Sequence, residues 1–226
     1  MEVHPKIAHH RFPGMSIRRF PPPSVLPPAV WLLTAPRRGR LLAAVLRSLQ
    51  PGDLPPPRVF RDPGGPPVRP AERPVRGFRA MLTAAVAESA APWLLCLEDD
   101  IAIHPRLLHH LTLWPPFYQG RIRTFASLYN PTLPRAPGRP GRTWHRADPR
   151  FFYGAQALLI ARPFALHALK NWHTVIGMQS QRLAALATRD FPDTPIFVHR
   201  PSLVQHVATH SSWGLPLHRA ADFESA

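Results

Sequence analysis

The amino-acid sequence predicts a single-domain α/β fold, with a mostly parallel central sheet and helices on both of its faces. Its short apolar runs contain few polar residues, as in strands that are buried on both faces. Segments with helical spacing of apolar residues alternate with these runs, and Pro- and Gly-rich turns separate them. This alternation is typical of a parallel sheet whose strands are joined by helices.

The expected strands are short runs rich in leucine, β-branched and aromatic residues. In chain order they are 29–34 (AVWLLT), 58–61 (RVFR), 93–97 (WLLCL), 124–128, 155–161 (AQALLIA), 196–199 and 202–207. The expected helices have apolar residues three and four positions apart and end near Pro or Gly. They are 41–50, 78–89, a segment from Pro105 to Trp114, 162–171 and 178–188. The pattern is clearest in the second of these helices, where Phe78, Met81 and Leu82 begin one apolar face.

We expect one folded domain over residues 29–215, preceded by a Pro/Arg-rich arm (1–28) and followed by a tail (216–226). With 226 residues, of which 45% are hydrophobic, the chain can bury one substantial core. The single cysteine, Cys96, excludes an intramolecular disulfide and is expected to pack inside a strand. The apolar run at 28–35 is too short to span a bilayer, so we expect a cytoplasmic protein.

The chain is strongly basic, with a formal net charge of +15. Of its 28 basic residues, all but Lys6 and Lys170 are arginines. Such a positive field favours phosphate-bearing ligands, anionic glycans, nucleic acid or an anionic membrane face, and peripheral contact with the inner membrane stays open. The arginines are spread along the chain without a recognisable RNA-binding motif, so no specific nucleic acid is expected. A basic nucleic-acid-binding protein is kept as an alternative.

Three adjacent acids, Glu98, Asp99 and Asp100, directly follow the predicted strand 93–97. They stand out in a chain with only 13 acidic residues, because neighbouring carboxylates repel one another where water is scarce. Ligands of such sheets bind beyond the carboxyl ends of the strands, where these acids lie. Carboxylate oxygens suit Mg²⁺ or Mn²⁺, which substrate phosphates and water then complete. We expect such a metal site here; the alternative, a helix N-cap, needs only one acid.

Other catalytic motifs are missing from the sequence. It has no Gly-x-Gly-x-x-Gly, no Walker-type phosphate loop, no Cys-x-x-Cys pair and no Gly-x-Ser-x-Gly elbow. His206 and His210 have the spacing of a zinc metalloprotease, but Val207 stands where such an enzyme needs glutamate. A nucleotidyltransferase that uses the acidic motif on a phosphate remains a second enzymatic alternative.

Three blocks of the sequence together resemble the N-acetylglucosaminyltransferase IV family of sugar-nucleotide transferases. They are LEDDI (97–101), YGAQALLI (153–160) and RPSLVQHVATHSSWG (200–214). More distantly, the chain is similar to bacterial lipooligosaccharide glycosyltransferases. The resemblance implies a GT-A-like fold and a metal-dependent, inverting transfer of a sugar such as GlcNAc. The donor would be a UDP-sugar and the acceptor a glycan or glycolipid hydroxyl.

The resemblance also implies roles for individual residues. Glu98 and Asp100 would fill the outer positions of an Asp-x-Asp-like motif, with Asp100 on the metal and Glu98 or Asp99 on the donor. His206 is the first choice for a further metal ligand, and His210 is the second. The remaining expected contacts are Thr34, Arg37, Asp62 and Arg79 for the nucleotide, and Tyr153, Gly154 and Gln156 where donor and acceptor meet.

The sequence departs from this family at the general base, which an inverting transferase needs to remove the acceptor proton. The family is expected to place an acid before its last strands. Here that segment reads VIGMQSQRLAAL, and the first carboxylates after it are Asp190 and Asp193. These two acids are therefore the base candidates. The glycine that follows His-Val in the family is Ala208 here.

Overall fold

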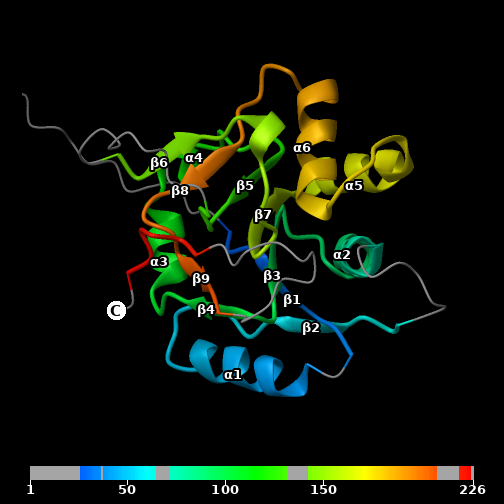
Figure 1. Cartoon of the computed structure of the whole chain (residues 1–226). Helices are drawn as coiled ribbons and strands as arrows, with labels where there is room; N and C mark the ends of the chain where they lie inside the picture. The colour runs from blue at the N-terminus through cyan, green and yellow to red at the C-terminus, as the bar shows by residue number, and fades with distance from the viewer. Residues whose placement is uncertain (1–25, 37, 65–71, 132–141, 208–218, 225–226) are drawn as a thin grey trace, which may run out of the picture.

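A computed structural model describes residues 26–36, 38–64, 72–131, 142–207 and 219–224 of the chain (Figure 1). Within these ranges the strands form a seven-stranded sheet, in the order β2-β1-β3-β7-β5-β8-β6, and a separate two-stranded sheet of β4 and β9. The strands of the large sheet are β1 (Ala29–Thr34), β2 (Arg58–Arg61), β3 (Trp93–Glu98), β5 (Phe125–Ser127), β6 (Trp144–Arg146), β7 (Ala157–Ala161) and β8 (Phe197–His199). Those of the small sheet are β4 (Ile101–Ile103) and β9 (Val204–His206).

The large sheet is mixed but mostly parallel. Strand β1 pairs in parallel with β2 and β3, and β5 pairs in parallel with β8. Strand β7 is antiparallel to both β3 and β5, and β6 is antiparallel to β8. Five strands of this sheet therefore share one direction, and β7 and β6 run the other way. The predicted α/β class is confirmed.

Helices cover both faces of the large sheet, as predicted. They are α1 (Gly39–Leu49), α2 (Glu72–Glu88), α3 (Leu107–Thr112), α4 (Pro115–Tyr118), α5 (Arg162–Asn171) and α6 (Gln179–Asp190), with 3₁₀ turns η1 (Pro149–Phe151) and η2 (Trp172–Thr174). One core cluster joins α2, α5 and α6 to the sheet, and a second joins α1, α3, α4 and the small sheet to the opposite face. Figure 1 shows α1 apart from the α2, α5 and α6 group.

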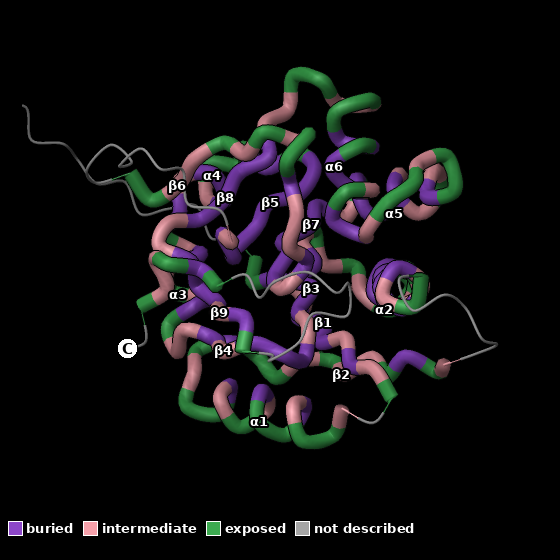
Figure 2. Tube along the Cα trace, in the orientation of Figure 1, coloured by how far each residue is buried: buried purple, intermediate pink, exposed green. Residues whose placement is uncertain are grey.

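Strand β3 lies at the centre of the molecule and is buried along most of its length (Figure 2). Leu94, Leu95 and Leu97 are at most 1% exposed, and burying each such side chain stabilises the fold by about 1.5–3 kcal/mol. Cys96 is buried among them, and this burial raises the pKa of its thiol to about 12. The thiol therefore stays protonated and packs as an apolar group, as predicted. Two core clusters on either side of this strand fix where its carboxyl end, and the acids, emerge.

Three expected elements differ from those observed. Helix α2 begins at Glu72, six residues before the predicted start, because Pro74 is tolerated within a first helical turn. The predicted helix to Trp114 is only α3, which ends at Thr112; the short helix α4 follows from Pro115 and was not predicted. The last predicted strand is only β9, and it pairs with β4 instead of joining the large sheet.

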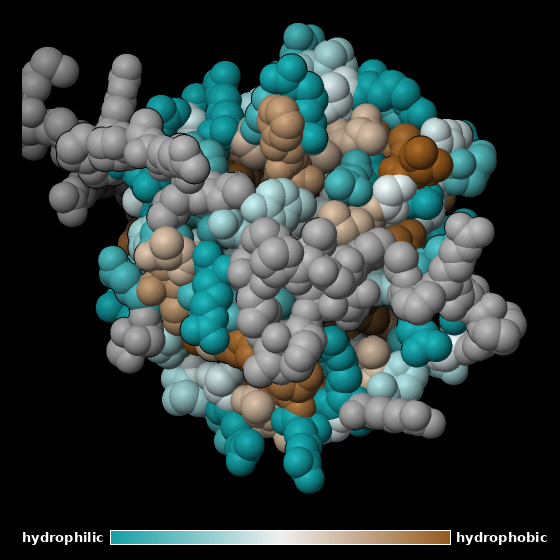
Figure 3. Space-filling view, viewed as in Figure 1, coloured by the Kyte–Doolittle hydropathy of each residue, from teal (hydrophilic) through white to brown (hydrophobic). Residues whose placement is uncertain are grey.

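The predicted arm and tail lie mostly outside the described residues. Within the tail, residues 219–224 pack on β9: the side-chain amide of Gln205 donates to Ala220 O and accepts from Ala220 N, both at 2.9 Å. In the described ranges, no helix has the length and apolarity needed to cross a membrane. Hydrophilic side chains prevail on the face seen in Figure 3, where apolar ones gather only in small patches.

Candidate functional site

The three acids lie where β1, β2 and β3 all end, at the carboxyl edge of the large sheet. In the parallel register Leu33 is opposite Glu98, so Thr34 falls beside Asp99. The Thr34 hydroxyl donates to Asp99 Oδ2 at 2.6 Å, and the backbone N–H of Asp62 donates to Thr34 O at 2.9 Å. The predicted nucleotide-contacting residues Thr34 and Asp62 are thus brought next to the acidic cluster.

Arg38 supplies the positive charge that the adjacent acids require. Its Nη1 donates to Asp99 Oδ1 at 2.7 Å and to Asp100 Oδ2 at 2.9 Å. Asp99 is 2% exposed and Asp100 is 5% exposed, so this guanidinium compensates two buried carboxylates. Sequence reasoning had selected Arg37, which lies outside the described residues. Arg38, the next residue in the sequence, was not among the predicted contacts.

The small sheet brings His206 to the same place. The pairing of β4 with β9 sets Ile101 opposite His206, and Val207 N donates to Asp100 O at 2.9 Å. His206 Nε2 lies 3.5 Å from Asp100 Oδ2, and both side chains are buried. The predicted convergence of Asp100 and His206, from distant parts of the chain, is confirmed. His210, the second choice, lies outside the described residues.

The neighbouring acids have opposite pKa shifts. Burial together with the charge of Asp100 raises the pKa of Glu98 to about 8. Burial acts on Asp100 in the same direction, but the interactions with His206 and Arg38 outweigh it, so the pKa of Asp100 falls below its ordinary value. At neutral pH, Asp100 is therefore the ionised carboxylate of the pair, and Glu98 carries a proton most of the time.

The residues present fit a divalent cation. Asp100 Oδ1 is buried and has no hydrogen-bond partner within the described residues, although the other oxygen of this carboxylate is paired with Arg38. A carboxylate oxygen and an imidazole nitrogen both suit Mn²⁺. The described residues hold no group of three or more His, Cys, Asp or Glu placed to bind a metal. Two protein ligands are nevertheless typical where phosphates and water supply the rest.

Asp99 has less freedom to contact a donor than the resemblance implies. One of its carboxylate oxygens accepts from Thr34 and the other from Arg38. With both oxygens bonded inside the protein, the Asp99 carboxylate links the end of β3 to Thr34 and Arg38, which lie at and just after the end of β1. Glu98 is less constrained: its Oε1 accepts a single hydrogen bond from Gln179 Nε2, at 3.2 Å.

Arg79 is not brought to the cluster. The early start of α2 places it in the middle of that helix, on the exposed side, where its charge acts on Arg182. The expectation that Arg79 lies at the start of a helix is wrong, because α2 begins at Glu72. A contact of Arg79 with the nucleotide stays a prediction. Asp62, in contrast, is buried and faces Gly77 of α2, with Oδ1 accepting from Gly64 N at 3.1 Å.

Tyr153, Gly154 and Gln156 lie at the same edge as the acids. Glu98 N donates to Gln156 O at 3.1 Å, which continues the β3–β7 ladder past its last strand pair. Burial and then the charges of Tyr153, Glu98 and Asp100 raise the pKa of Tyr129, so this phenol stays protonated close to the cluster. Sequence reasoning did not select Tyr129, since nothing in the pattern after β5 distinguishes it from a core aromatic residue.

At Gly154 both the backbone conformation and the nearby side chains disfavour a residue with a Cβ atom. Its φ is +97°, and an added Cβ would lie 3.1 Å from Gln156 Oε1 and 3.2 Å from a Tyr129 ring carbon. We expect Gly154→Ala to destabilise the fold by about 1–3 kcal/mol, measured by urea unfolding. Gly120→Ala is the control, because Gly120 has φ +62° but open space around it. Equal losses in the two variants would contradict a steric role for the contact with Tyr129.

The general-base candidates lie elsewhere. Asp190 ends α6 while Gln179 begins it, and a helix of 12 residues spans roughly 18 Å. Asp190 accepts from Arg189 and contacts His167 Nε2 at 2.6 Å, and Asp193 is exposed in the following turn. The structure therefore does not bring either acid to the cluster. Gln179, which is 4% exposed and bonded to Glu98, occupies the near end of α6 instead.

Two comparisons with known proteins gave no match to this chain. A scan against protein-family models found no match, and a search of curated proteins returned no significant one. The interpretation of the site consequently depends on its own geometry and on the resemblance of the three sequence blocks.

Proposed function

We propose that this chain is a metal-dependent glycosyltransferase that transfers a sugar from a UDP-sugar to a hydroxyl group of a glycan or glycolipid. The observation that carries this proposal is the placement of Asp100 and His206 beside one another at the carboxyl end of β3. Within this proposal, a GT-A-like assignment rests on the resemblance of the three sequence blocks and on the acids at the carboxyl end of a central strand of an α/β sheet.

The residues around the cluster are suited to binding a nucleoside diphosphate. Asp100 and His206 would bind Mn²⁺ or Mg²⁺, and the bound ion would offset negative charge on the departing diphosphate. Arg38 is 28% exposed at its side chain, so phosphate oxygens can reach the guanidinium that now contacts Asp99 and Asp100. Asp62 follows the neighbouring parallel strand, but its buried carboxylate accepts from Gly64 N and faces Gly77 of α2, so it does not carry the proposed nucleotide contact.

The proton of the acceptor hydroxyl needs a separate acceptor. Gln179 stands at the end of α6 that lies near the cluster, and an amide cannot take up a proton. Donor binding is therefore better supported than a fast transfer step. Measuring release of UDP from a panel of UDP-sugars, with and without added saccharides, separates slow hydrolysis from transfer.

Metal-dependent binding of UDP is the direct test of the donor site. We expect UDP with Mn²⁺, each at about 100 times its Kd, to stabilise the protein by about 3 kcal/mol and to raise Tm by roughly 5–10 °C. Asp100→Asn should abolish this shift, because the carboxylate that binds the ion is lost. Asp193→Asn, which changes an exposed acid after α6, should retain it.

An oligonucleotide arm of the same experiment distinguishes the competing function. A salt-sensitive Tm shift with a short oligonucleotide, and none with UDP and Mn²⁺, would favour a nucleic-acid-binding protein and reject the transferase. A UDP shift that is unchanged in Asp100→Asn would reject the metal site.

A further inference from the structure

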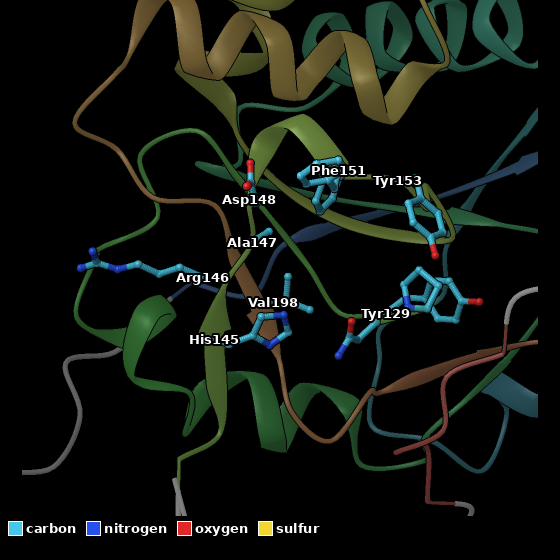
Figure 4. A pocket seen from close by; sticks show the side chains of 11 residues that line it. Tyr129, His145, Arg146, Ala147, Asp148, Phe151, Tyr153 and Val198 are labelled. Atoms are coloured by element: carbon cyan, nitrogen blue, oxygen red, sulfur yellow. The ribbon is translucent and has the colours of Figure 1, made fainter. Parts of the chain in front are cut away.

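A cavity of about 260 Å³ opens beside the acidic cluster, between β6, η1 and the segment after β5 (Figure 4). The lining residues used here are Tyr129, Asn130, His145, Phe151, Tyr153 and Val198. Its volume is just below the range of about 300–1,000 Å³ usual for pockets that bind drug-sized molecules, so one small ring fits it better than a chain of rings. Tyr129 and Tyr153 connect it to the cluster, because the charges of Glu98 and Asp100 act on Tyr129.

Two buried polar atoms in the cavity wall have no hydrogen-bond partner within the described residues. They are Nδ2 of Asn130 and Nδ1 of His145. Leaving a buried donor or acceptor without a partner costs about 1–3 kcal/mol each, so a ligand that bonds to both atoms would recover stability. Asn130 is 2% exposed, and its backbone N–H donates to Ser202 Oγ at 3.0 Å. This backbone bond and the burial of the side chain fix the position of Asn130 in the cavity wall.

The cavity offers aromatic surface and neutral hydrogen-bonding groups instead of charge. Phe151 is 72% exposed at the rim, although it is large and apolar. Burial and the charge of Arg200 lower the pKa of His145, so its imidazole is neutral and can both donate and accept. Arg146 points away from the cavity in Figure 4, and Asp148 is paired with Arg150 at 2.6 Å. This combination suits the apolar face and the hydroxyl groups of a sugar ring better than a phosphate.

We propose that the cavity is a sugar-binding subsite that takes one neutral monosaccharide residue, with Phe151 against the ring face and Asn130 and His145 bonded to its hydroxyls. Within the proposed function this monosaccharide residue belongs to the acceptor, and only that part of the inference rests on the proposed function. Tyr129 and Tyr153 line the subsite on one side of the acidic cluster. Arg38 and Thr34 contact the cluster from the other side, where β1 ends.

Sugar binding can be measured without donor hydrolysis. The probes are the methyl glycosides of glucose, galactose, mannose and N-acetylglucosamine, observed by saturation-transfer NMR and titrated for Kd, in EDTA and again with UDP and Mn²⁺. We expect at least one glycoside to bind the wild type and to bind about five- to tenfold more weakly to Phe151→Ala and to Asn130→Ala. Leu166→Ala, which truncates an exposed apolar residue of α5, is the matched control and should bind like the wild type.

The outcomes separate this inference from the donor site. Binding that survives in Asp100→Asn but weakens in Phe151→Ala and Asn130→Ala supports the subsite even if no UDP shift is found. The subsite is overturned if no glycoside binds in either condition, or if all variants bind equally. Circular dichroism and Tm identify a variant that has lost its fold. If Asn130→Ala is such a variant, Phe151→Ala decides the outcome, because Phe151 is exposed and its truncation should leave the fold intact.

Discussion

Arg38→Ala is expected to destabilise the protein by about 3–5 kcal/mol at neutral pH. The substitution removes the guanidinium that contacts both Asp99 and Asp100, and breaking a buried ion pair from one side leaves uncompensated charge in a low-dielectric environment. Because Arg38 is itself 28% exposed at its side chain, water can reach the vacated space and the lower end of that range is expected. Urea unfolding in EDTA at pH 7 measures the loss.

The matched control is an exposed ion pair of the same chemistry. Arg58 contacts Glu88 at 2.9 Å, and the two side chains are 57% and 54% exposed. Such a pair contributes about 0–1 kcal/mol, so Arg58→Ala should lose much less stability than Arg38→Ala. If the two variants lose equal amounts, Arg38 is not the main countercharge of the cluster.

The same variant discriminates a metal site from a purely structural ion pair. A cation bound by Asp100 would replace part of the charge that Arg38 provides, so Mn²⁺ should stabilise Arg38→Ala more than it stabilises the wild type. Combining Arg38→Ala with Asp99→Asn should recover stability, because one of the two unpaired charges is removed. Mn²⁺ that stabilises neither protein would leave the cluster as an internal ion pair without a metal.

The central strand and its acids could be predicted because their signal is local. A fully apolar run followed by three carboxylates needs only a parallel sheet to place the acids at its carboxyl edge, and β3 confirms this placement. The resemblance predicts that His206 lies near the acids. Of the two strands that bring it there, β9 falls within the predicted strand 202–207, whereas β4 was not predicted. Strand β4 is only three residues long, with two residues between it and β3, and a strand this short shows no periodic pattern.

The residues that sequence reasoning missed depend on turns and helix ends. Arg38 reaches the acids because of the backbone conformation between β1 and α1, which no sequence pattern specifies. Asp190 lies away from the acidic cluster because it is at the opposite end of helix α6 from Gln179. The sequence predicts the length of this helix but not which of its ends lies near the cluster. Strand β6 reads Trp-His-Arg and, as a polar edge strand, lacks the apolar alternation that identifies strands.

A loss of about 3 kcal/mol of stability is expected between pH 6.5 and pH 4 from a single residue, His199. The imidazole is 2% exposed, lies 5.1 Å from the Trp114 ring and contacts Pro201 O through Nδ1 at 2.7 Å, so this nitrogen carries the proton. Burial lowers the pKa of His199 from 6.5 to about 4, and charges on His110 and His104 act in the same direction.

The sign follows from proton uptake. Between pH 6.5 and 4 the unfolded chain binds a proton at His199 that the folded chain does not bind, so the free energy of unfolding falls as the pH falls. Each pKa unit corresponds to about 1.4 kcal/mol, which gives the expected total. Above pH 6.5 both states leave this imidazole neutral, and stability should not depend on it.

His199→Asn isolates this contribution, because its amide nitrogen can replace the Nδ1 donor while it cannot be protonated. The variant is expected to be less stable than the wild type at pH 7, where it loses ring packing against Trp114, yet to lose about 3 kcal/mol less on going to pH 4. The exposed His173→Asn variant should follow the wild-type profile throughout. Parallel profiles of the wild type and His199→Asn across this interval would mean that His199 is protonated in the folded protein, and that the packing around β8 admits a charge.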